Sequence, residues 1–119
     1  MLMTYKALFL SPMIPSTNLT ETANFFRDIL DFSIDLDNEV YVVCQKDNLT
    51  IHLLRAGQEI GEMELYLEVD NVDTLWSKIR DKLRGLKYKE PFNQQYGMRE
   101  IHICIPHTNA LLFIGQKIH

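Results

Sequence analysis

The sequence predicts an α+β fold in which a single domain, residues 1–119, contains two copies of a strand-helix-strand-strand-strand (βαβββ) module, at residues 1–56 and 61–119. Three observations predict this fold. A chain of 119 residues with 46% hydrophobic side chains has the size and apolar content of one domain with a real core. Two segments have apolar residues at helical spacing and begin at an asparagine. After each of them, short strand-like runs follow in the same order.

The first module is expected to begin with a strand near residues 5–10, followed by a proline-containing crossing. Pro12 and Pro15 each lack a backbone donor, which favours an edge strand or a crossing over a central strand. Asn18 has the position of a helix N-cap, with Glu21 three residues later as in a capping box. A helix of about three turns is therefore predicted after this cap.

Three strands are predicted after the first helix, at residues 32–36, 40–44 and 49–54, because short apolar runs are separated there by polar turns. A fifth strand is predicted at residues 63–69. Its polar and aromatic positions alternate with two leucines and a valine, which is typical of a sheet with two unlike faces. We therefore expect Tyr66 on the face opposite to the helices.

The second helix is predicted from its own cap, Asn71, and its apolar positions repeat the spacing of the first helix. Gly85 has the position of a helix stop. Residues 87–97 are expected to form a loop that is longer than its counterpart in the first module.

The two modules align with one another along the chain. The matches are Asn18-Leu19 with Asn71-Val72, residues 27–30 with 80–83, residues 40–44 with 100–104, and residues 50–53 with 110–113. One matching tetrapeptide arises easily by chance, but caps, helices and later strands that match in order do not. Under this alignment His52 corresponds to Leu112.

Charge and hydropathy argue against several classes of partner. The 12 Lys and Arg against 16 Asp and Glu give a net charge of −4, and no basic run offers a footprint for nucleic acid. The apolar run at residues 7–10 is far shorter than a bilayer span. Cys44 and Cys104 are too few for a disulfide framework, and we expect both to be reduced thiols in buried strands. These features predict a cytoplasmic protein with no nucleic-acid and no membrane partner.

The C-terminal part of the sequence resembles a family signature. Residues 96–116 read YGMREIHICIPHTNALLFIGQ, which is similar to the Trp/Tyr-Gly-x-Arg-x-Phe, Asp-Pro-x-Gly-Asn and final-strand pattern of bleomycin-resistance proteins. The helix exit FFRDILDF at residues 25–32 is also similar to theirs. The turn keeps only Pro106 and Asn109 of the family pattern, so we expect it to follow a different backbone path. Over nearly its whole length the chain resembles the glyoxalase/bleomycin-resistance/dioxygenase (vicinal oxygen chelate) superfamily.

This resemblance implies curved mixed sheets whose concave walls form cups that are completed in a homodimer. It also implies where metal-dependent members would place four ligands, on the first and last strands of each module. In this sequence those positions are Ser11, His52, Glu64 and Leu112. Leu112 has no donor atom, and a neutral Ser11 hydroxyl is a poor ligand for a divalent ion. We therefore expect no metal and no other cofactor in a cup that these residues line.

The resemblance also implies an aromatic wall. Tyr66 shares a strand face with Glu64 and Glu68, where bleomycin-type binders place aromatic side chains that stack on a planar ligand. Phe92 and Tyr96 lie in the predicted loop, whose aromatic and amide side chains could clasp a flat polar ligand. For both segments a purely structural role is the alternative.

His102 lies in the middle of a predicted strand, so it is either a hydrogen-bonded sheet residue or a ligand contact. The predicted function is capture of a planar or aromatic small molecule without metal and without catalytic residues. A metal-dependent lyase, isomerase or dioxygenase of the same superfamily is the second interpretation, and a regulatory module with a vestigial cup is the third. A metal-free enzyme with His52 and Glu64 as acid and base is also open. Exchange of the first strand between subunits is an open alternative as well.

Overall fold

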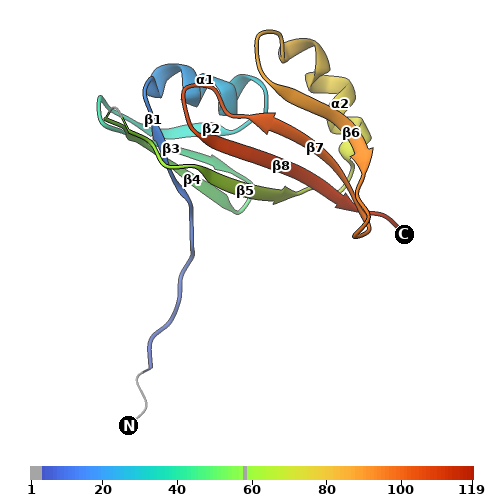
Figure 1. The fold of residues 1–119 in the computed structure, drawn as a ribbon. Helices are drawn as coiled ribbons and strands as arrows, with labels where there is room; N and C mark the ends of the chain where they lie inside the picture. The colour runs from blue at the N-terminus through green and yellow to red at the C-terminus, as the bar shows by residue number, and fades with distance from the viewer. Residues whose placement is uncertain (1–3, 58) are drawn as a thin grey trace.

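The chain folds into two four-stranded mixed sheets, each backed by one helix (Figure 1). The computed structural model describes residues 4–57 and 59–119. The first module contains β1 (Met13–Ser16), α1 (Leu19–Asp28), β2 (Ser33–Asp37), β3 (Tyr41–Lys46) and β4 (Leu49–Arg55). The second contains β5 (Met63–Glu68), α2 (Val72–Ile79), the short 3-10 helix η1 (Arg80–Lys82), β6 (Tyr88–Asn93), β7 (Met98–Cys104) and β8 (Ala110–Lys117). The predicted pair of βαβββ modules is confirmed.

The two sheets have the same topology. The strand order is β1-β4-β3-β2 in the first sheet and β5-β8-β7-β6 in the second. In each sheet the first strand of the module lies at an edge and pairs in parallel with the last strand, while the other pairs are antiparallel. The helix between the first two strands covers one face of its own sheet.

Both helices begin where their asparagine caps predict. The Asn18 side chain accepts a hydrogen bond from the Glu21 backbone N–H at 3.1 Å, and Asn71 accepts one from Thr74 at 3.0 Å. Each cap satisfies a backbone donor that would otherwise have no partner within the helix.

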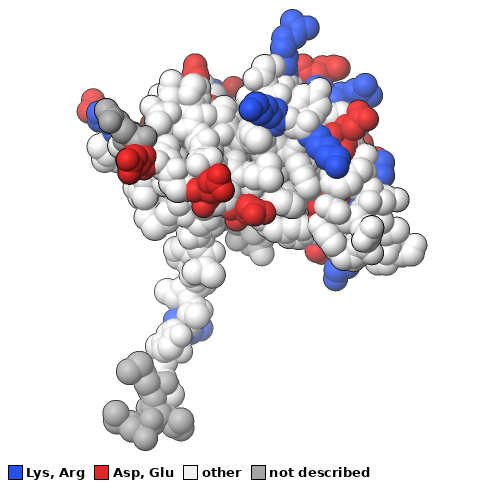
Figure 2. Space-filling view, viewed as in Figure 1, with Lys and Arg blue, Asp and Glu red and all other residues white. Residues whose placement is uncertain are grey.

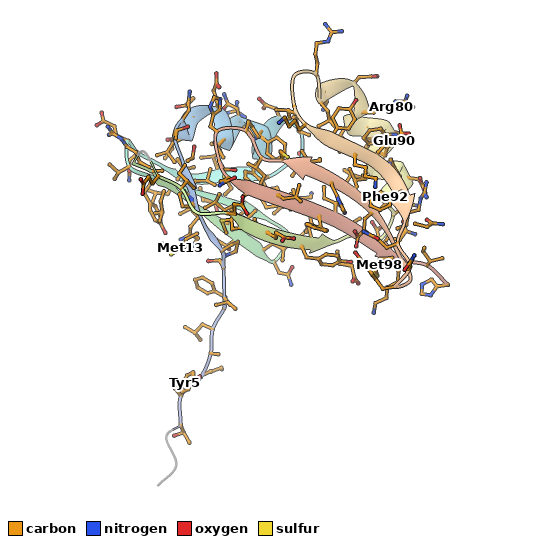
Figure 3. The ribbon with its side chains drawn as sticks, viewed as in Figure 1. Tyr5, Met13, Arg80, Glu90, Phe92 and Met98 are labelled. Atoms are coloured by element: carbon orange, nitrogen blue, oxygen red, sulfur yellow. The ribbon has the colours of Figure 1, made fainter. Side chains whose placement is uncertain are left out.

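The strand predicted at residues 5–10 is not formed, and the first strand is β1 instead. Residues 4–10, here called the arm, extend away from the two sheets with Tyr5 far from the body of the protein (Figures 1 and 3). Within the described residues, the arm belongs to neither sheet. Pro15 does lie in an edge strand, where its missing N–H leaves no ladder bond unmade.

The loop predicted at residues 87–97 contains the edge strand β6, so only residues 94–97 form the turn into β7. A strand was not predicted here, because Pro91 lies inside β6 and the side chains of β6 are mostly exposed. An edge strand tolerates both features. The register with β7 shifts between Lys89 and Phe92, as at a β-bulge.

The two faces of each sheet differ in burial. Side chains on the face toward the helix form the core and include Val42 and Leu53 in the first sheet and Ile101 and Ile114 in the second. We call the opposite face, which no helix covers, the inner face. Tyr66 lies on the inner face of the second sheet and is 50% exposed, as its alternation with leucines predicted.

The modules are joined by contacts between the β7–β8 turn and the start of α1. The Thr17 backbone N–H donates to the His107 carbonyl at 2.9 Å, and the Thr22 hydroxyl donates to the Pro106 carbonyl at 2.8 Å. His107 also contacts the Glu21 carboxylate through its ring. This turn, the part of the family signature that departs most from the pattern, therefore holds the two modules together.

The two cysteines lie in different sheets and form no disulfide. Cys44 is buried, but Cys104 is exposed, which corrects the expectation that both are core residues. Cys104 is exposed because it lies on the inner face, opposite Leu111. No helix within residues 4–57 and 59–119 is long and apolar enough to cross a membrane.

Candidate functional site

The inner face of the second sheet carries two adjacent rows of side chains. One row runs Phe92, Glu100, Gly115 and Glu68 across β6, β7, β8 and β5, because these residues are partners in the strand registers. Residues that oppose one another in neighbouring strands point to the same face. The face therefore combines a buried carboxylate, an exposed carboxylate and a glycine without a side chain.

The neighbouring row is largely aromatic and contains His102, Phe113 and Tyr66. The His102 ring lies 4.2 Å from the Phe113 ring and 5.0 Å from the Phe92 ring, measured between centroids. The Lys89 ammonium lies 3.8 Å from the centroid of Phe92, a cation–π distance. The rings of Phe92, His102 and Phe113 are therefore contiguous, and Tyr66 is the strand partner of Phe113; we call these four side chains the aromatic wall.

Tyr66 lies flat across β8 because Gly115 has no side chain. A Cβ atom added at Gly115 would lie 2.5 Å from the Tyr66 hydroxyl oxygen, closer than such atoms approach. The glycine therefore sets the direction of the tyrosine ring on the inner face. Burial and the charges of Glu68 and Glu100 raise the pKa of Tyr66, so its hydroxyl stays protonated at neutral pH.

Glu100 is the buried charge of this face, with 0% exposure. Its carboxylate accepts hydrogen bonds from the Tyr96 hydroxyl at 2.6 Å, the His102 Nε2 at 2.8 Å and the Gln94 side-chain amide at 3.1 Å. Burial raises the pKa of Glu100, but these hydrogen bonds together outweigh burial and hold the pKa below its usual value. Glu100 is therefore an ionised carboxylate beneath the aromatic wall.

Tyr96 covers this carboxylate from the turn between β6 and β7. The hydrogen bond to Glu100 raises the pKa of Tyr96 to about 12, with burial and the charge of Glu100 acting in the same direction. The rest of the Tyr96 side chain is exposed. Tyr96 thus belongs to the rim of the inner face, although Phe92 belongs to strand β6 and not to a loop.

His52 lies in the first sheet, apart from this group. It is on the inner face of β4, where its ring contacts the Tyr41 hydroxyl. Ser11 precedes β1 and is partly buried. The structure therefore brings together Glu64, Tyr66 and Glu68 on β5 with residues of β6 and β7, while His52 and Ser11 belong to the other module.

The predicted correspondence of His52 with Leu112 is wrong by one residue. Met13 and Tyr66 lie five residues before their helix caps, and they pair with His52 and Phe113, respectively. His52 therefore corresponds to Phe113. Leu112 lies on the helix side of its sheet and is 4% exposed, because a shift of one residue moves a side chain to the opposite face.

The residues at the metal positions do not fit a divalent ion. With the corrected register these positions hold Ser11, His52, Glu64 and Phe113, and the phenyl ring of Phe113 has no donor atom. A stable site needs three or four donors of suitable chemistry. Within residues 4–57 and 59–119, no three side chains of His, Cys, Asp and Glu are grouped for such a site.

An apolar groove of about 340 Å³ lies at the junction of the modules, and Tyr66 and Glu68 of the inner face also line it. Its lining includes Phe9 and Leu10 of the arm, Leu49 of β4 and Leu67 of β5. The register of β4 with β1 begins at His52, so residues 49–51 of β4 have no strand beside them on that edge. The groove is therefore next to an unpaired strand edge.

Sequence reasoning missed Glu100, Phe113 and Gly115 as site residues. A signal for Glu100 was present, because Glu100 and His102 alternate with isoleucines that point into the core. Two polar residues spaced by two on an otherwise apolar strand indicate a shared face. Phe113 and Gly115 had no such signal, since their roles depend on contacts across strands.

Solved structures of other proteins have the same fold as this chain. The chain is similar to a bleomycin-binding protein from Streptomyces verticillus complexed with copper(II)-bleomycin, with a TM-score of 0.78, 16% identity, and coverage of 93% of this chain and 97% of the other. It is also similar to a glyoxalase/bleomycin resistance protein/dioxygenase from Nocardioides, with a TM-score of 0.76, 12% identity, and coverage of 98% and 87%. A third similar structure is lactoylglutathione lyase from Agrobacterium tumefaciens, with a TM-score of 0.75, 14% identity, and coverage of 95% and 96%.

No protein-family model matches the sequence, and no curated protein matches it significantly. The three similar structures nevertheless show that the chain has the fold of the glyoxalase/bleomycin resistance/dioxygenase proteins. This fold is shared by binding proteins and by enzymes. The function has to be argued from the side chains of the inner face.

Proposed function

We propose that this chain binds a planar aromatic or heterocyclic molecule on the inner face of its second sheet, without a metal ion and without catalysis. The aromatic wall is the observation that carries the proposal. Phe92, His102 and Phe113 present contiguous rings, and Tyr66 is the strand partner of Phe113 on the same face. Ring stacking contributes about 0.5–1.5 kcal/mol beyond the area that it buries.

The charge of this face favours a neutral or cationic ligand. Glu64 and Glu68 are exposed beside Tyr66, and Glu100 keeps its negative charge beneath the wall. An anionic ligand would be repelled by all three carboxylates.

A homodimer that completes the cup is part of the proposal. In one chain the inner face is an open wall, and half of the Tyr66 side chain is exposed. The arm has exposed apolar side chains, of which Leu10 is 99% exposed, and apart from Lys6 it carries no charge (Figure 2). Such a segment is stabilised when it packs on a second subunit. We propose that the arm lies along the apolar groove and the unpaired β4 edge of the partner.

The bleomycin-binding protein from Streptomyces verticillus supports a small molecule as the partner, since it shares this fold and was determined with copper(II)-bleomycin. By the same argument we propose sequestration of a toxic compound, with antibiotics as one class. A cytoplasmic location belongs to the proposal because the two cysteines form no disulfide.

A titration with three planar probes tests the proposal. The probes are N-methylacridinium, acridine and 9-anthracenecarboxylate, which are a cation, a neutral molecule and an anion of similar shape. We expect the cation and the neutral probe to bind and to raise the melting temperature, and the anion to bind at least tenfold more weakly. If none of the three binds at millimolar concentration, the proposal is wrong.

A parallel titration with metal ions tests the enzymatic alternative. Because two of the four metal positions lack a good ligand, we expect Zn²⁺, Ni²⁺ and Fe²⁺ to leave the melting temperature unchanged. Stoichiometric metal in protein purified without chelator, lost in His52→Ala and Glu64→Ala, would contradict the metal-free proposal. It would favour a lyase, isomerase or dioxygenase.

A further inference from the structure

The buried carboxylate of Glu100 and the imidazole of His102 form a pair whose protons can be assigned. An ionised carboxylate only accepts hydrogen bonds. Its three partners, Tyr96, Gln94 and His102, must therefore all donate to it, and the His102 Nε2 must carry a proton. The protonation of one ring nitrogen is thus dictated by the buried charge beside it.

The other ring nitrogen of His102 is free to act as an acceptor. A neutral imidazole has one N–H, so Nδ1 carries a lone pair when Nε2 is protonated. Within the described part of the chain, Nδ1 has no hydrogen-bond partner. Every fully enclosed side-chain nitrogen or oxygen in that part of the chain has a partner, so Nδ1 must be open to solvent.

The orientation of the His102 ring is held by packing as well as by the hydrogen bond. The ring lies between Phe92 and Phe113, at centroid distances of 5.0 and 4.2 Å. A flip of the ring would break the 2.8 Å bond to Glu100 and leave a buried charge with fewer donors, which is costly. A single acceptor atom is therefore held in a fixed place within the aromatic wall.

We propose that Glu100 is a positioning residue that holds His102 as the hydrogen-bond acceptor of the aromatic wall, so that the preferred ligands are planar molecules with an N–H or O–H donor on the ring edge. This inference rests on the proposed binding function and narrows its ligand class. Stacking alone does not distinguish one planar molecule from another, whereas an oriented acceptor rewards a ligand that donates to it.

The tautomer of His102 can be measured without any ligand. Long-range ¹H–¹⁵N correlation spectra of the imidazoles at about pH 8 report which ring nitrogen carries the proton, since imidazoles are generally neutral there. We expect His102 to be a single Nε2–H tautomer in the wild type and a mixture in Glu100→Gln. Glu90→Gln removes the same charge from an exposed position on β6 of the same sheet and is the matched control (Figure 3).

The ligand preference is tested with a matched pair, 2-naphthol and 2-methoxynaphthalene, which differ by one O–H donor. We expect the wild type and Glu90→Gln to bind 2-naphthol roughly three- to tenfold more tightly, the range of one net hydrogen bond. The preference should weaken in Glu100→Gln, because only part of the His102 population then offers Nδ1 as an acceptor. It should disappear in His102→Phe, which keeps an aromatic ring between Phe92 and Phe113 and serves if Glu100→Gln does not fold.

The outcomes separate this inference from the proposed function. Equal affinity of the wild type for both compounds, or a preference that survives in His102→Phe, overturns the role of the Glu100–His102 pair while leaving the binding function intact. A mixed tautomer in the wild type overturns it as well. Failure of both compounds and of the acridine probes to bind overturns the binding function itself.

Discussion

At the scale of residues, the close approach of Tyr66 to Gly115 links one backbone position to the shape of the wall. A Cβ at position 115 would collide with the Tyr66 hydroxyl, and the three atoms nearest to it all belong to the Tyr66 side chain. The atoms that must move are the far end of a half-exposed side chain. Gly115→Ala should therefore change the ligand site much more than the fold.

The Gly115→Ala variant is expected to melt close to the wild-type temperature and to bind N-methylacridinium about tenfold more weakly, as one aromatic contact is worth. In a Tyr66→Ala background the same change should have no further effect on affinity, because the ring that it displaces is already gone. Additive losses in the double variant would contradict the assigned contact. Isothermal titration and thermal melts measure both quantities.

The Tyr66→Ala variant tests whether Tyr66 contacts the ligand or belongs to the core of the protein. Since half of this side chain is exposed, we expect a small change in melting temperature and an affinity loss of about tenfold for the planar probes. Ile114, on the helix side of the neighbouring strand, is fully buried and is the control. Ile114→Ala should cost about 2–5 kcal/mol of unfolding free energy. A loss of stability in Tyr66→Ala as large as that would identify the tyrosine as a core residue.

The buried charge of Glu100 predicts a dependence of stability on acid. Its pKa in the folded protein lies below the usual value of 4.5, so the ionised form stabilises the fold above that pH. This contribution is lost as the pH falls through the lower pKa of the folded state. The difference in melting temperature between wild type and Glu100→Gln should be largest near neutrality and shrink below about pH 4. A difference that stays constant from neutral to acidic pH would show that Glu100 stabilises only by its shape.

At the scale of elements, sequence patterns predicted the parts that depend on local chemistry. The caps Asn18 and Asn71 and the alternation around Tyr66 each involve residues close together in the chain, and the structure confirms them. The edge strand β6 was missed because Pro91 and its exposed side chains resemble a loop. What supports this strand is the ladder with β7, which only the folded chain provides.

Register is the other property of the elements that the sequence did not determine. The alignment of modules placed Leu112 where Phe113 lies, because the turn between β7 and β8 is longer than the turn between β3 and β4. In a strand an error of one residue exchanges the two faces. The face of Tyr66 on β5 was therefore predicted correctly, whereas the residue of β8 that shares this face was placed one position too early.

Substitution of a helix cap measures how much the capping hydrogen bond contributes to the stability of the protein. Asn71→Ala removes the side-chain acceptor of the Thr74 N–H and should cost about 0.5–2 kcal/mol of unfolding free energy. Asn71→Ser replaces the lost acceptor and should recover most of that loss. Equal destabilisation by both substitutions in urea melts would show that the asparagine acts through something other than its cap.

At the scale of the whole molecule, a single chain leaves its inner face open and the apolar side chains of its arm exposed. The two modules are joined within one chain by backbone and side-chain hydrogen bonds at the turn between β7 and β8. The arm is left largely exposed by that fold, because residues 4–10 extend away from both sheets (Figure 1). A second subunit is the natural place for its apolar side chains to be buried.

Removal of residues 1–10 is therefore expected to convert a dimer into a folded monomer. The truncated chain keeps β1 and every contact between the modules, so its circular dichroism should match that of the full chain, while light scattering at micromolar concentration should report half the mass. Phe9→Glu with Leu10→Glu should act like the truncation, because in the proposed dimer both side chains are buried against the partner, where a charge is costly. Lys6→Ala is the control, because it removes the only charge of the arm and leaves its apolar residues in place.

If the cup is completed across the interface, the monomeric variants should also bind the planar probes more weakly than the dimer. A wild-type chain that is monomeric at these concentrations would contradict the dimer, and full probe affinity in the truncated monomer would show that one inner face is sufficient for binding.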